Sequence, residues 1–239
     1  MKSLDIIICF IDDSAFEHEL VRDEIASIAP DIHFIQAYTF EEAKGLLGKK
    51  IPLLFLLDLW GQDEKVPNPY LTPKNELQQM ISRFNTLESV YEGLDHYQGD
   101  KANEYLKRLF RIVDSWRDLF EEVCSRVGQN RKYGLANLIQ VRDHFPGIPA
   151  VFYTRKSLIN DAIALFKAGS DGLFKKPTGK NDVETHTMTR EYAPDLMKDL
   201  FTIINSKIDG LNAYQTFYRE EAGLDVDALI TTWKEFKNK

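Results

Sequence analysis

Side chains that could take part in phosphoryl or metal chemistry follow four apolar runs of the sequence. Asp12 and Asp13 come directly after "LDIIICFI", and Asp58 ends "IPLLFLLD". Thr154 ends "IPAVFYT", and Lys176 stands in "DGLFKKP". Burying an unpaired carboxylate at the end of such a run costs several kcal/mol. Asp58 in particular therefore needs a cation or a hydrogen-bond donor beside it.

Three carboxylates that lie close together cannot all stay ionised without a cation, because each one raises the pKa of the others. A hard divalent ion such as Mg²⁺ relieves this repulsion and prefers oxygen ligands. With a metal bound, Asp58 becomes a candidate nucleophile. Lys176 could then supply positive charge, and Thr154 a hydroxyl donor, to a transferred phosphoryl group.

Short apolar runs alternate with segments of helical periodicity along much of the chain. Strands that alternate with helices predict a parallel sheet with helices on both faces, and function then collects at the carboxyl ends of the strands. The five candidate residues would therefore meet at one edge of the sheet. The predicted strands are 4–11, 32–38, 51–58, 148–154 and 171–177, and the helices between them are 15–30, 40–47, 134–145 and 158–169.

A long helical segment separates the third predicted strand from the fourth. Apolar residues recur at intervals of three and four over 72–97 and again over 101–128, with a short turn between the two stretches. This pattern predicts an antiparallel helical hairpin inserted into the α/β fold. Beyond Pro177 we expect a further helix from about Pro194 and a short final helix near 225–236.

The motifs "FIDDS", "LLFLLDLW", "AVFYT" and "FKAGSDGLFKKP" together resemble the receiver domain of response regulators in two-component phosphorelays. The resemblance implies a flavodoxin-like, doubly wound five-stranded parallel sheet. The receiver would comprise residues 1–60 and 134–177, the helical hairpin 61–133, and a helical C-terminal extension 178–239.

The resemblance also implies a role for each site residue. Asp58 would accept a phosphoryl group from a histidine kinase or a histidine phosphotransfer protein. Asp13, Asp58 and the carbonyl of Trp60 would bind Mg²⁺, while Asp12 would act largely through water. Thr154 and Lys176 would hold phosphate oxygens, and the Lys176–Pro177 bond is often cis in this family.

The net charge and the length of the N-terminal apolar run argue against nucleic-acid binding and membrane insertion. The formal net charge of −7 gives no overall attraction to nucleic acid or to anionic membranes, and the N-terminal apolar run is too short for a signal peptide or a membrane span. We expect a cytoplasmic protein, with two cysteines that form neither a disulfide framework nor a zinc site. No separate enzymatic or DNA-binding output domain is recognisable, so we expect the signal to be passed on through protein contacts of the insertion. A homodimer is one option for the oligomeric state.

Two alternatives remain open at this stage. The family usually has an aromatic residue three positions before the lysine, where this chain has Leu173. That difference favours a receiver-like scaffold that phosphorylation does not regulate. An aspartate-nucleophile phosphohydrolase of another α/β family is disfavoured, because Trp60 stands where such enzymes have a second acid.

Overall fold

The computed structural model describes residues 6–62, 68–155, 159–221 and 223–238. The chain divides into two compact units, one formed by residues 1–61 and 131–239 and the other by residues 62–130.

The first unit is built on a five-stranded sheet in which every pair of neighbouring strands is parallel. The strand order is β2-β1-β3-β6-β7, which is the order of the flavodoxin-like doubly wound fold. The predicted fold class is therefore confirmed. The strands are β1 (Ile6–Ile11), β2 (Ile32–Ala37), β3 (Leu54–Leu57), β6 (Ala150–Thr154) and β7 (Gly172–Lys175).

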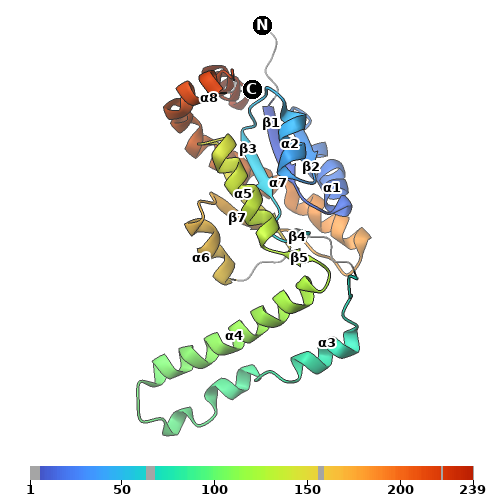
Figure 1. Cartoon of the computed structure of the whole chain (residues 1–239), viewed down its shortest axis with the longest axis vertical. Coiled ribbons are helices and arrows are strands. Elements are labelled where there is room, and N and C mark those ends of the chain that lie inside the picture. Colours follow the sequence, from blue (N-terminus) through green and yellow to red (C-terminus); the bar gives the residue numbers. More distant parts are fainter. Residues whose placement is uncertain (1–5, 63–67, 156–158, 222, 239) are drawn as a thin grey trace. The chain divides into compact units, whose positions relative to one another are not determined.

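Helices cover both faces of this sheet (Figure 1), so its central strands are buried on both sides. Every residue of β1, β3 and β6 is buried, which explains why these strands appear in the sequence as unbroken apolar runs rather than as alternating patterns. The covering helices are α1 (Ala15–Leu20), continued by a π-helical turn Val21–Ile25 and a 3₁₀ turn Ala26–Ile28, together with α2 (Phe40–Leu47), α5 (Lys132–His144), α6 (Ile159–Lys167) and α7 (Asp182–Lys207).

Helix α7 begins at Asp182, twelve residues before the predicted start at Pro194. The side chain of Asn181 caps it by accepting a hydrogen bond from the N–H of Glu184. Its early turns carry few apolar residues and are held to the π-helical turn after α1 by the buried Glu24, which accepts hydrogen bonds from His186 and Arg190. Helix α7 therefore covers the sheet as part of the first unit.

The remaining C-terminal helices belong to the same unit. They are the 3₁₀ helix Ile208–Tyr214, α8 (Gln215–Glu221) and α9 (Val226–Lys237). Trp233 on α9 is buried and donates a hydrogen bond to Asn205 on α7, and the Tyr218 hydroxyl donates to the carbonyl of Pro146. The extension thus packs on the α/β unit, and the predicted final helix is confirmed.

The second unit is the helical insertion. Its second arm is one continuous helix, α4 (Lys101–Ser125), as the apolar pattern predicts. The first arm is broken into α3 (Lys74–Ile81) and two 3₁₀ helices, Leu87–Tyr91 and Leu94–His96. Gly93 adopts a φ of 64°, which interrupts the helix between the two 3₁₀ turns.

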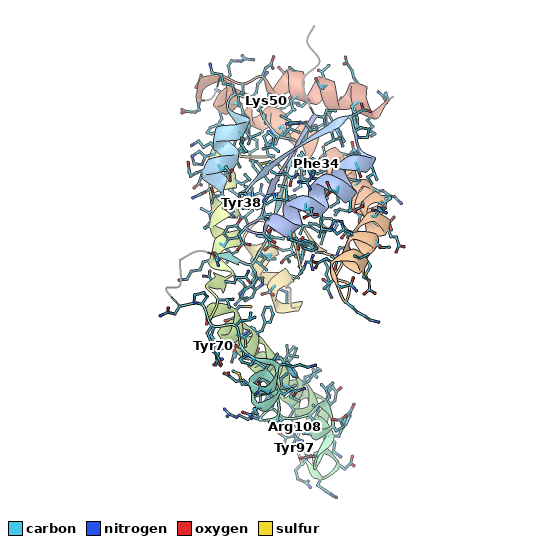
Figure 2. All side chains as sticks on the ribbon, turned by 90° about the vertical axis from the view of Figure 1, so that its right-hand side faces the viewer. Phe34, Tyr38, Lys50, Tyr70, Tyr97 and Arg108 are labelled. Carbon is cyan, nitrogen blue, oxygen red and sulfur yellow. The ribbon has the colours of Figure 1, made fainter. Side chains whose placement is uncertain are left out.

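Arg108 of α4 fastens this broken arm, because its guanidinium donates hydrogen bonds to the carbonyls of Val90 and Glu92; Arg108 and the nearby Tyr97 are labelled in Figure 2. Two short strands, β4 (Gly61–Gln62) and β5 (Gln129–Asn130), pair as a separate two-stranded sheet. Among the described residues, no helix has the length and the apolar character that a membrane span requires.

Candidate functional site

The three predicted acids meet at the carboxyl edge of the sheet. Asp12 directly follows β1 and Asp58 directly follows β3, and these two strands are neighbours. Asp12, Asp13 and Asp58 each offer a carboxylate oxygen, and the three oxygens lie within 4.8 Å of one another. Asp12 is 1% exposed and Asp58 is 6% exposed, so most of their charge is removed from bulk water.

Lys176 enters this cluster from the end of β7. Its ammonium donates a hydrogen bond to Asp12 Oδ2 and another, of 3.1 Å, to Asp58 Oδ1. The side chain is 3% exposed and its Nζ lies 5.7 Å from the ring centroid of Phe10 and 5.6 Å from that of Tyr153. The aromatic rings exclude water from the ammonium while the carboxylates neutralise it.

Burial and charge act against each other in this cluster. Burial raises the pKa of Asp12 to about 7, although the Lys176 charge lowers it. Burial disfavours the charged form of Lys176, but the negative charges of Asp12, Asp58 and Glu17 outweigh this effect and raise the pKa of the ammonium. Lys176 is therefore a permanent cation at neutral pH.

The donor set suits a divalent metal ion. When all three carboxylates are ionised, Asp12, Asp13, Asp58 and Lys176 carry a formal charge of −2, which one divalent cation would balance. All the candidate ligands are oxygens, as Mg²⁺ requires. Two of the carboxylates are already oriented by backbone donors, because Ser14 N–H bonds Asp12 Oδ1 at 2.8 Å and Trp60 N–H bonds Asp58 Oδ2 at 3.1 Å.

Thr154 is the last residue of β6 and is 1% exposed. Its carbonyl accepts a hydrogen bond of 3.0 Å from the backbone N–H of Lys176, so the two residues are coupled through the main chain. All described peptide bonds are trans, including Lys176–Pro177; the cis bond that the resemblance implies is absent.

Two charged residues of the site were not predicted from the sequence. Glu17 on α1 is 6% exposed and its Oε2 lies 3.6 Å from Lys176 Nζ. Its other oxygen accepts a 2.6 Å hydrogen bond from Nε of Arg155. Arg155 directly follows Thr154, and this place after a candidate residue at a strand end could have indicated it as a site residue. Nothing in the sequence marked Glu17, because an acid in the first turn of a helix is ordinary.

Helix α5 approaches the backbone directly after β3 very closely at Gly134. A Cβ at this position would lie 2.5 Å from the carbonyl oxygen of Asp58 and 2.6 Å from Cα of Leu59. The N–H of Gly134 bonds the carbonyl of Leu59 at 3.2 Å, and the neighbouring Tyr133 hydroxyl donates to the carbonyl of Tyr38, labelled in Figure 2, at the end of β2. The backbone directly after Asp58 is thus fixed by α5.

Comparisons with known proteins give structural similarities only. No protein-family model matches the sequence, and no curated protein matches it. Among solved structures, the chain is similar to a CheY-like response regulator receiver domain protein from Methanospirillum hungatei JF-1, with 12% identity, coverage of 85% of this chain and 99% of that chain, and a TM-score of 0.42.

Two further solved structures are also similar. The response regulator domain of Thermotoga maritima CheB has 15% identity, coverage of 84% of this chain and 96% of that chain, and a TM-score of 0.44. The Mn(2+)-bound form of response regulator Rcp1 has 15% identity, coverage of 78% and 91%, and a TM-score of 0.39. By its own strand order, the first unit has the fold of the receiver domains that the sequence resembles.

Proposed function

We propose that this chain is a phospho-accepting receiver in which Asp58 takes a phosphoryl group from a phosphohistidine of a kinase or phosphotransfer protein. The observation that carries the proposal is the buried cluster in which Lys176 bonds both Asp12 and Asp58 while Asp13 lies alongside. Strongly perturbed charged groups that gather at the carboxyl end of a parallel sheet, where function collects, favour a functional site.

Asp13, Asp58 and the Trp60 carbonyl would hold Mg²⁺, with Asp12 acting largely through water. The metal would supply positive charge against the transferred phosphoryl oxygens. An oxygen of Asp58 attacks phosphorus while the bond from phosphorus to the donor imidazole nitrogen breaks. That nitrogen keeps the electron pair and takes up a proton, so the donor leaves as neutral histidine.

Lys176 is the residue that links transfer to a change in the protein. Before transfer its ammonium is shared between Asp12 and Asp58. The phosphoryl group brings additional negative charge and acceptor oxygens to Asp58, and these compete for Lys176 and for the Thr154 hydroxyl. Because the Lys176 N–H is bonded to the Thr154 carbonyl, a shift of either residue is transmitted to the ends of β6 and β7.

Output is proposed to pass through protein contacts of the helical insertion, which begins directly after Trp60 and Gly61. The phosphoform is proposed to hydrolyse slowly, because Trp60, two residues beyond Asp58, is 4% exposed and large enough to keep water from the acyl phosphate. Lys156, two residues beyond Thr154, is a position where the receiver family that the sequence resembles adjusts the phosphate lifetime; it lies outside the described residues.

A constitutive scaffold is the second candidate. Leu173 favours this candidate, because it stands where the family usually has an aromatic residue. Its side chain is half-buried, and it pairs with Phe152 in the sheet. In that case the acids would bind a metal but phosphorylation would not alter the protein.

The test is incubation with Mg²⁺ and a small-molecule phosphodonor, followed by intact-mass measurement. We expect a mass gain of one phosphoryl group in the natural chain and none in Asp58→Asn. Asp31→Asn, an exposed acid of the same unit, is the matched control and should be phosphorylated like the natural chain. Absence of uptake in a folded protein that still binds Mg²⁺ would refute the receiver proposal and favour the scaffold.

A further inference from the structure

Glu17 lies between two cations at the edge of the acid cluster. Its Oε1 accepts a 2.6 Å hydrogen bond from Arg155 Nε, whereas its Oε2 lies 3.6 Å from Lys176 Nζ. The first contact is a short, charge-assisted hydrogen bond, and the second is too long to be a hydrogen bond. Glu17 is therefore held by Arg155. Lys176 makes its hydrogen bonds to Asp12 and Asp58 instead.

Burial makes the partner of Glu17 important. Glu17 is buried and the Arg155 side chain is 25% exposed, so salt and water screen the pair only in part. A buried carboxylate that loses its partner is left uncompensated, which is costly. The other cation beside Glu17 is Lys176, whose ammonium pKa the negative charge of Glu17 helps to raise. Without Arg155, Glu17 would compete with Asp58 for this ammonium.

The guanidinium of Arg155 has a donor that is not in use. Among the residues that the structure describes, its Nη2 is buried and has no hydrogen-bond partner. Nε and Nη2 of a guanidinium face the same side, and together they can bind both oxygens of one carboxylate. Only Nε bonds Glu17 here. The guanidinium carbon also lies 5.4 Å from the centroid of the Phe16 ring, which favours its place beside α1.

We propose that Arg155 is a positioning residue that prevents Glu17 from binding Lys176. The ammonium then stays with Asp58 before transfer and is available to the phosphoryl group after transfer. This inference rests on the proposed function. When the phosphoryl oxygens attract Lys176, Glu17 loses a neighbouring cation, and Arg155 compensates because its Nη2 can bond the second oxygen of the carboxylate.

Two other roles of Arg155 lead to different expectations. A purely structural ion pair would join α1 to the end of β6 and would affect only the stability of the fold. A guanidinium that binds the phosphoryl group directly would be needed whether or not Glu17 is charged. The role proposed here depends on the charge of Glu17, so removal of that charge should make Arg155 dispensable.

The experiment measures the rate constant of phosphorylation of the full chain with Mg²⁺ and excess acetyl phosphate, followed by intact mass. Loss of a donor that contacts the transition state directly slows a reaction about a hundred- to a thousandfold. Arg155 acts only through Lys176, so we expect Arg155→Ala to be slower by about tenfold. Arg155→Lys, which keeps the charge, should be slowed less. Arg219→Ala, at an exposed arginine of the same unit, is the matched control and should react like the natural chain.

The double variant Arg155→Ala with Glu17→Gln distinguishes the three roles. We expect it to recover the rate of the natural chain to within about threefold, because the two side chains act on Lys176 as a pair. Circular dichroism at the assay temperature establishes that each variant is folded.

Two results would overturn the inference while the natural chain remains a phospho-acceptor. One is a double variant as slow as Arg155→Ala, since Arg155 would then act on the phosphoryl group itself. The other is a folded Arg155→Ala that reacts at the natural rate, since the ion pair would then be structural only. If the natural chain takes up no phosphoryl group, the proposed function is wrong and this inference is wrong with it.

Discussion

Replacing Lys176 by methionine should destabilise the first unit strongly, and Mg²⁺ should reverse much of the loss. The substitution keeps the apolar stem between the rings of Phe10 and Tyr153 but removes the cation that bonds Asp12 and Asp58. Removing one member of a buried ion pair costs about 3–5 kcal/mol, because the other charge is left uncompensated. For a chain of this size we expect the melting temperature to fall by about 6–20 °C in metal-free buffer.

The response to Mg²⁺ distinguishes this cause from simple loss of packing. Without Lys176 the three carboxylates repel one another more strongly, so they should bind the metal more tightly than in the natural chain. A ligand at a hundred times its dissociation constant stabilises the folded state by about 2.7 kcal/mol. At equal Mg²⁺ concentration, thermal unfolding should therefore show a larger gain for Lys176→Met than for the natural protein.

Lys175→Met is the matched control, since Lys175 is the neighbouring residue and is exposed. Its free energy of unfolding should change by less than about 0.5 kcal/mol. Equal melting temperatures of the two lysine variants would contradict this prediction. So would a stabilisation of Lys176→Met by Mg²⁺ that is no larger than that of the natural chain.

Four other predictions concern the site. Burial raises the pKa of Asp12 from 3.8 to about 7, so the unfolded chain loses this proton at lower pH than the folded chain does, and the folded state loses stability as pH rises from about 4 to 7. Urea titrations should show the natural chain losing stability relative to Asp12→Asn between about pH 4 and 7. An equal loss in both would contradict the assignment. Gly134→Ala should lower the free energy of unfolding by about 1–3 kcal/mol and slow phosphorylation, because the new Cβ would collide with the Asp58 carbonyl. The control Gly45→Ala, which has open space around the new Cβ, should have neither effect. Trp60→Ala should shorten the lifetime of the phosphoform measured by loss of label; an unchanged lifetime would mean that Trp60 does not shield the acyl phosphate. Replacing residues 62–130 by a short linker should leave phosphate uptake intact, because every site residue belongs to the first unit. Loss of uptake in a folded product would show that the insertion completes the site.

The strands and the central site residues could be predicted because burial leaves a plain signal in the sequence. A strand that is covered on both faces needs an uninterrupted apolar run, and a parallel sheet brings the ends of such runs to one edge. Asp12, Asp58 and Lys176 each stand at the end of one of these runs. Their convergence followed from topology alone.

The elements that were missed lack this signal. The early turns of α7 carry buried threonines, Thr185 and Thr189, which bond the backbone one turn earlier, and apolar periodicity cannot detect a helix held by polar groups. Glu17 joins the cluster only because α1 turns it towards Lys176. The break in the first arm of the insertion depends on Gly93 and on weak local helix preference, which the regular apolar spacing concealed.

The pairing of β3 with β6 joins the two stretches of chain that form the α/β unit. Hydrogen bonds across the sheet, rather than the covalent route through residues 62–130, hold the end of β3, and with it Asp58, beside β6. A chain severed within that route should therefore remain assembled, and two separately expressed fragments divided there would be expected to reconstitute the cluster of three acids with Lys176.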